Sequence, residues 1–156
     1  MSASSAPVLN RKPSSSGLGL AWVLMWFALA IHVADEALTG FLAVYNPTVL
    51  ALRAKLGFWP IPTFEFREWL AGLAIGIFVV ACLSPFAFHN APWIRSILYF
   101  LAIVTGIINA LGHTLGTILG HTVSTIRFPR PAPGFYSSPL LLIVSIYALV
   151  QLRRTR

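Results

Sequence analysis

Four long apolar runs, separated by short polar stretches, constrain this chain more than any other feature of its sequence. The runs cover residues 18–44, 69–88, 93–122 and 138–152. A helix needs about 20 mostly apolar residues to cross a bilayer. The pattern therefore predicts an all-α fold, an integral membrane bundle of four transmembrane helices within residues 18–152. The last run is short for a full span unless residues 135–137 join it.

The composition favours the same class of protein. The chain is 57% hydrophobic and only 10% charged, with a mean hydropathy of +0.79, whereas soluble domains carry about 25% charged residues. The net charge of +7 comes mostly from residues outside the apolar runs. It indicates contact with anionic lipid headgroups rather than with nucleic acid. Cys82 is the only cysteine, which excludes an intrachain disulfide and a thiolate metal motif.

The two ends of the chain differ from the runs between them. Residues 1–17 are rich in Ser, Ala and Pro and predict a disordered tail, and residues 153–156 form a basic tail. Four spans would place both tails on one side, which carries a slight excess of Lys and Arg. The positive-inside rule then favours cytoplasmic termini in a bacterial-type inner or plasma membrane.

A polar cluster, His32, Asp35 and Glu36, interrupts the first apolar run. Two of the four acidic residues of the chain are in it, although a carboxylate at bilayer depth costs on the order of 2.5–3.5 kcal/mol. At positions i, i+3 and i+4, the three side chains share one helix face. An imidazole and two carboxylates on one face can bind a metal ion or carry out acid/base catalysis. The alternative is a structural cluster that hydrogen-bonds neighbouring helices.

The third run carries a second polar pair, Asn109 and His113, at positions i and i+4. The pair lies on a helix stripe whose other members are small or short: Ala102, Gly106, Thr117 and Gly120. Gly112 and Gly116 add small residues at four-residue spacing beside it. Because small residues let helices approach closely in lipid, this face is predicted to press on a neighbouring helix, with Asn109 and His113 opposite the first cluster.

Other polar or proline-containing positions give weaker predictions. Pro47 is expected to end or kink the first helix, and residues 48–57 are expected to form a short interfacial helix. Glu65, just before the second run, is expected to cap the helix that follows. His121 lies well round the helix from His113, and the sequence assigns it no role.

The segment His32-Val33-Ala34-Asp35-Glu36 resembles the signature of the HXXEE-domain family of small integral membrane proteins, with Asp in place of the first Glu. The resemblance implies a later Asn and His on a third helix, which Asn109 and His113 match. It also implies a Tyr-x-Pro-Gly segment before the last helix, which Pro133-Gly134 matches in part, with Pro131 at the Tyr position. The family is regarded as membrane enzymes of unsettled reaction, so the resemblance implies an enzyme and leaves its chemistry open.

These observations predict a membrane-embedded enzyme. Its expected catalytic residues are His32, Asp35, Glu36, Asn109 and His113. In a metal-dependent version, His32, His113 and one or both of Asp35 and Glu36 hold an ion such as Zn²⁺ or Fe²⁺, and a carboxylate that is not a ligand acts as a general base. The expected reaction is hydrolysis of a lipid-like or amphipathic substrate.

Two alternatives stay open. In a metal-free version, a desolvated Asp35 or Glu36 acts as an acid and His113 as a base, isomerising or cyclising an isoprenoid or sterol-like substrate. In the other, the chain is a non-enzymatic membrane transport or assembly protein. Transporters usually contain internal repeats, whereas the first and third runs here carry different motifs.

Overall fold

The computed structural model describes residues 15–121, 123 and 126–154, and this part of the chain is helical with no β-strand. The all-α prediction is therefore confirmed. The helices, in chain order, are α1 (Ser15–Thr39), α2 (Leu42–Leu56), α3 (Phe66–Cys82), α4 (Ser84–Phe88), α5 (Pro92–Phe100), the π-helix η1 (Leu101–Ile108), α6 (Asn109–Leu119) and α7 (Ser138–Arg154). Most of the tail predicted over residues 1–17 lies outside the described residues, while its last three residues belong to α1.

Three helical stretches among the described residues are long and apolar enough to cross a membrane: Gly17–Thr39, Phe66–Phe88 and Pro92–Leu119. They correspond to the first three predicted spans. α7 has 17 residues and is not among them. The structure thus supports a membrane protein with three candidate spans.

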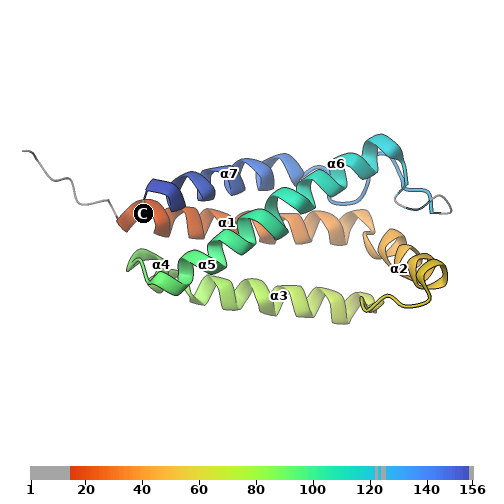
Figure 1. Cartoon of the computed structure of the whole chain (residues 1–156), viewed down its shortest axis with the longest axis horizontal. Coiled ribbons are helices and arrows are strands. Elements are labelled where there is room, and N and C mark those ends of the chain that lie inside the picture. The colour runs from red at the N-terminus through yellow and green to blue at the C-terminus, as the bar shows by residue number, and fades with distance from the viewer. Residues whose placement is uncertain (1–14, 122, 124–125, 155–156) are drawn as a thin grey trace, which may run out of the picture.

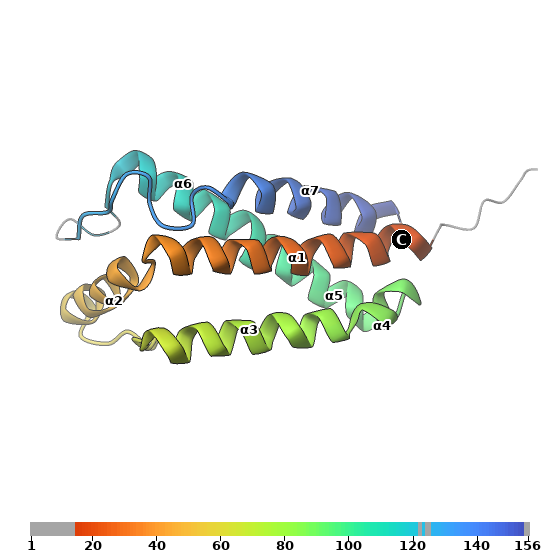
Figure 2. The same cartoon turned by 180° about the vertical axis from the view of Figure 1, so that it is seen from behind.

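The helices α1, α7 and α3 run side by side, and the rod formed by α5, η1 and α6 crosses them obliquely (Figures 1 and 2). The short helix α2 lies across the end of the molecule where α1 stops. The described chain begins and ends at the opposite end. α1 is in contact with α3, α4, α7 and η1, which makes it the central helix.

The apolar core is centred on the first half of α1. Trp22 and Met25 are fully buried there, with Ile94 of α5 and Leu141 of α7. The indole Nε1 of Trp22 donates a hydrogen bond of 2.8 Å to the backbone oxygen of Val80, which joins α1 to α3. His32, Asp35 and Glu36 lie in the second half of α1, so the core and the polar cluster occupy different levels of the bundle.

Gly40, not Pro47, ends the first helix, which corrects the sequence prediction. Gly40 has a φ of +77°, a left-handed conformation that terminates helices and that glycine adopts without steric cost. The chain turns there and enters α2, which contains Pro47 in its interior. The short helix predicted over residues 48–57 exists, but it begins earlier, at Leu42.

The third run is not one regular helix, because η1 interrupts it. A π-helix turns more widely than an α-helix and so changes the face that later residues present. Within η1, Gly106 packs against Ser145 of α7, and a Cβ added at Gly106 would overlap that side chain. This close approach of two helices is the contact that the small-residue stripe predicted.

After η1, Asn109 and His113 of the stripe face His32 and Glu36 of α1, as predicted. Gly116 and Gly120 meet a loop and not a helix, which corrects the prediction for the last part of the stripe. A Cβ at Gly116 would lie 3.0 Å from the ring of Phe128, and one at Gly120 would lie 2.8 Å from Arg130. Both neighbours belong to the segment that follows α6 and folds back over it. Gly112 faces open space, with no atom within 4 Å of an added Cβ.

Candidate functional site

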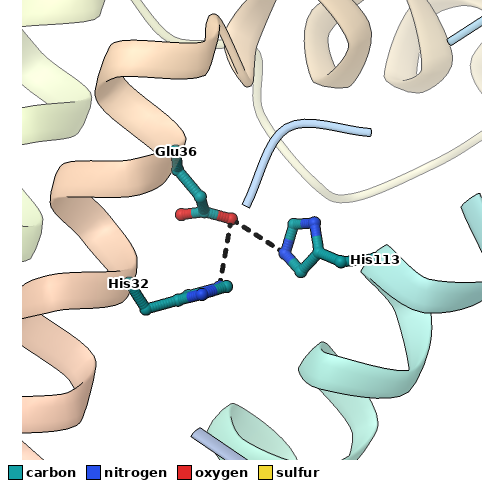
Figure 3. Close-up of side chains that lie close together, drawn as sticks. All are labelled: His32, Glu36 and His113. Atoms are coloured by element: carbon teal, nitrogen blue, oxygen red, sulfur yellow. Dashed lines mark ion pairs between the residues drawn. The ribbon is translucent and has the colours of Figure 1, made fainter. Parts of the chain in front are cut away.

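His32, Glu36 and His113 meet in the second half of the bundle (Figure 3). His32 and Glu36 are one turn apart on α1, and His113 comes from α6. The Oε1 atom of Glu36 lies 3.6 Å from Nε2 of His32 and 3.1 Å from Nε2 of His113. The three residues are only 1%, 5% and 7% exposed, and one ligand atom from each lies within 4.8 Å of the others. A carboxylate and two imidazoles are therefore held together, away from solvent.

Asp35 stands beside this group and not within it. Its Oδ2 atom accepts hydrogen bonds from the backbone N–H and the hydroxyl of Ser137, at 2.8 and 2.7 Å. The same hydroxyl lies 2.8 Å from Nδ1 of His32. In place of the direct ligand role that the sequence predicted, the geometry gives Asp35 an indirect link to His32 through Ser137.

These contacts fix which nitrogen of His32 carries the proton. The single hydroxyl proton of Ser137 points to Asp35, since the carboxylate can only accept. The Ser137 oxygen must then accept from Nδ1–H of His32. In the neutral ring this leaves a lone pair on Nε2, where the amide N–H of Asn109 donates a hydrogen bond of 2.8 Å.

His113 presents a nitrogen without a hydrogen-bond partner. Its Nε2 atom is buried and, within the described part of the chain, no hydrogen bond of acceptable geometry reaches it. The nearest charged atom is Oε1 of Glu36. A lone pair facing a carboxylate is repelled by it, so a proton or a cation between the two groups would stabilise this arrangement.

Gly134 brings the backbone of the loop before α7 against the site. It has a φ of +80°, and an added Cβ would lie 2.7 Å from Cε1 of His113 and 3.0 Å from Cγ of Glu36. Its N–H donates to the hydroxyl of Thr39, and its carbonyl accepts from Ser138. Only glycine combines this conformation with so close an approach.

The cluster forms part of the wall of a cavity of about 530 Å³, bounded by α1, α2, α3, η1, α6 and the loop before α7. His32, Glu36, Asn109 and His113 line one side of it. The remaining wall is mainly apolar and includes Leu29, Phe41, Val44, Leu73, Ile108 and Phe128. An apolar cavity with a few convergent polar groups is typical of a site for a small molecule.

The other sequence candidates lie elsewhere. His121 is exposed and pairs through its backbone with Arg127. Glu65 occupies the N-cap position of α3, as predicted, but its side chain makes no capping hydrogen bond.

Ser137 and Thr39 are the site residues that sequence reasoning missed. Ser137 contacts both Asp35 and His32, and Thr39 receives the Gly134 N–H. The available signal was the polar pair Ser137-Ser138 at the start of an otherwise apolar run, next to the Pro-Gly segment.

We expect Ser137→Ala to weaken the site without unfolding the chain. The substitution breaks the link between Asp35 and His32, so the His32 ring loses its fixed tautomer and orientation. Loss of such a supporting group typically costs 10–100-fold in metal affinity or activity. The matched control is Ser145→Ala, because Ser145 is a buried serine of α7 whose hydroxyl donates to the backbone oxygen of Leu141. Equal effects of the two substitutions on metal binding would contradict the proposed role of Ser137.

Comparisons with protein-family models, with curated proteins and with solved structures each returned no match.

Proposed function

We propose that this chain is a membrane-embedded, metal-dependent hydrolase of a lipid-like or amphipathic substrate. The observation that carries the proposal is the group His32, Glu36 and His113, gathered in the wall of a largely apolar cavity. We include in the proposal that the chain is a member of the HXXEE-domain family. The support is the motif at residues 32–36, together with Asn109 and His113. It also includes α7 as a fourth span, since its 17 residues extend about 26 Å, close to the hydrocarbon thickness of a bilayer.

The donor set suits a divalent metal. Two imidazoles and a carboxylate are ligands of Zn²⁺ and Fe²⁺ and leave a coordination position open. Donors around a tetrahedral ion with bonds of 2.0–2.1 Å are roughly 3.3 Å apart, and the contacts of Glu36 measure 3.1 and 3.6 Å. The cation would also balance the buried charge of Glu36 and supply a partner for Nε2 of His113.

A bound ion of this kind supplies Lewis acidity, which polarises a carbonyl and acidifies water. The residues of the chain orient the ligands and bind the substrate. Asp35 and Ser137 hold the Nε2 atom of His32 toward the site. Asn109 lines the cavity and offers an amide donor to an oxygen of the substrate. The apolar wall takes up the substrate chain and keeps bulk water from the reacting groups.

The metal-free alternative has one observation in its favour. The amide N–H of Asn109 donates a hydrogen bond of 2.8 Å to Nε2 of His32. A metal bound by that nitrogen would have to displace this hydrogen bond. With this bond intact, Glu36 and His113 form an acid/base pair 3.1 Å apart. Such a pair could move a proton between two positions of an isoprenoid or sterol-like substrate.

Metal analysis of the purified full chain separates the two functions. The hydrolase proposal expects about one Zn²⁺ or Fe²⁺ per chain, loss of lipid-ester hydrolysis with a chelator, and recovery when the ion returns. Protein that contains no stoichiometric metal and whose activity a chelator does not affect would refute the metal-dependent version.

Filling the cavity should weaken substrate binding while the polar cluster stays intact. Gly112 lines the cavity and has open space around it, so Gly112→Leu places an isobutyl group where the substrate chain would lie. We expect KM for a long-chain substrate to rise about tenfold or more, because several methylene contacts are lost at about 0.8 kcal/mol each. Metal content should not change.

Gly76→Leu is the matched control for this experiment. Gly76 also has open space around it but lies on the exposed surface of α3. An unchanged KM in Gly112→Leu, or equal changes in both variants, would show that the substrate does not occupy this cavity.

A further inference from the structure

A second cavity, of about 690 Å³, lies between α5, η1 and α7 at the end of the molecule remote from α2. Two arginines from helices far apart in sequence line it, Arg95 on α5 and Arg153 on α7. We propose that this cavity binds an anionic phospholipid, with the phosphate held between Arg95 and Arg153 and an acyl chain lying along η1 and α7.

Four of the residues that line the cavity carry hydrogen-bond donors in their side chains. Arg95 lies in the first turn of α5, and Arg153 lies in the last turn of α7. The hydroxyl groups of Ser96 and Tyr99 line the same cavity. Guanidinium and hydroxyl donors are the groups that bind phosphate oxygens, and the planar guanidinium can do so with two parallel hydrogen bonds.

Apolar residues line the cavity further along the same helices. Ile103 lies about two turns beyond Arg95 on the rod of α5 and η1, and Leu149 lies about one turn from Arg153 toward the middle of α7. Charge at the membrane surface followed by apolar surface toward the bilayer centre matches the order of headgroup and acyl chain in a phospholipid. A soluble phosphate compound has no acyl chain that could contact these apolar residues.

Arg95 is held in a fixed position. Its Nη2 atom donates a hydrogen bond of 2.9 Å to the backbone oxygen of Leu152 in the last turn of α7. The bond joins the two walls of the cavity, so the guanidinium is oriented before a ligand arrives. A donor that is already ordered loses less conformational entropy on binding.

The distribution of charge favours an anion at this end. All four acidic residues of the chain lie toward the other end, near the junctions of α2 with α1 and α3: Asp35, Glu36, Glu65 and Glu68. The cavity end carries Arg95, Arg153 and Arg154 among the described residues. Basic pockets between membrane helices bind anionic headgroups by the same electrostatics.

Native mass spectrometry of the purified full chain in detergent tests the proposal. Phosphatidylglycerol should bind at one site with higher affinity than phosphatidylcholine, and glycerol 3-phosphate should not compete at equal concentration. Arg153→Gln should weaken phosphatidylglycerol binding about fivefold, the effect expected for one basic residue at a membrane surface. Arg95→Lys, which keeps the charge but not the planar fork, should also weaken it.

Arg154→Gln is the matched control, because Arg154 has the same charge on the next position of α7 but does not line the cavity. It should leave the affinity unchanged. Equal losses in Arg153→Gln and Arg154→Gln would overturn the site in favour of diffuse surface charge. Equal binding of phosphatidylcholine would overturn the preference for an anionic headgroup. Full competition by glycerol 3-phosphate would overturn the phospholipid as ligand. None of these readouts depends on enzymatic activity, so the result is independent of the proposed hydrolase.

Discussion

Under the proposed metal-dependent function, Glu36→Gln is expected to abolish metal binding and to leave the fold intact. In the part of the chain that the structure describes, Glu36 is the only carboxylate whose ligand atom lies with those of His32 and His113. The amide has the same shape but no charge and is a much poorer ligand. Since loss of a supporting group alone costs 10–100-fold, loss of this ligand should lower metal affinity and hydrolysis by more than about 100-fold.

The fold should survive because the apolar core lies at a different level of α1. Trp22 and Met25 are fully buried there and are far along the helix from Glu36. Metal content, hydrolysis and thermal unfolding in detergent should be measured together. Glu68→Gln, which removes the same charge from an exposed position in the first turn of α3, is the control and should retain both metal and activity.

The outcome of this substitution separates the competing functions. If the wild-type protein contains no metal and Glu36→Gln loses activity, the result favours the acid/base isomerase. Full function of both Glu36→Gln and His113→Ala, in well-folded protein, would refute an enzyme of either kind at this site. A change in stability alone would identify a structural polar cluster.

Gly134→Ala should have an effect of similar size through the backbone. The new Cβ would lie 2.7 Å from Cε1 and 2.9 Å from Nδ1 of His113, closer than any relaxed contact, so the imidazole has to move. A displacement of about 1 Å at a catalytic group can cost on the order of 100-fold in rate. We expect a loss of this size in hydrolysis, accompanied by weaker metal binding.

Gly40→Ala supplies the control for backbone strain. Gly40 has nearly the same φ, +77° against +80°, but no atom lies within 4 Å of an added Cβ. Gly40→Ala should lower the free energy of unfolding by about 1–2 kcal/mol, the cost of a left-handed non-glycine residue. Gly134→Ala should lower it by at least as much, because its Cβ also displaces His113. Only Gly134→Ala should impair the site. Equal activities in the two variants would show that the close contact with His113 is not needed for function.

The sequence determined the general class of the fold because lipid restricts the choices so strongly. Backbone groups in a bilayer must be paired within the segment, so long apolar runs with few charges become helices. Gly17–Thr39, Phe66–Phe88 and Pro92–Leu119 follow the first three runs to within a few residues. The helix ends were less predictable. Gly40 ends α1 by a left-handed turn, whereas Pro47, the expected breaker, is accommodated within α2.

The sequence also identified most residues of the candidate site, because charged and imidazole groups inside an apolar run are costly and therefore conspicuous. The spacing of His32 and Glu36 placed them on one face of α1, as the structure shows (Figure 3). No local pattern predicted which of the two neighbouring carboxylates would face His113 and which would not. Glu36 faces His113, while Asp35, one residue earlier, faces Ser137.

That partition was decided by tertiary structure alone. The loop before α7 lies about 100 residues after α1 in the sequence and returns to the site. Its Ser137 hydrogen-bonds to Asp35, and its Gly134 packs against His113. In the same way, the widened turns of η1 divide the small-residue stripe between Ser145 of α7 and the loop over α6. A hydrophobic pattern specifies which faces must be buried, but it does not specify which of several polar or small neighbours will cover them. Only the packing of distant segments settles that choice.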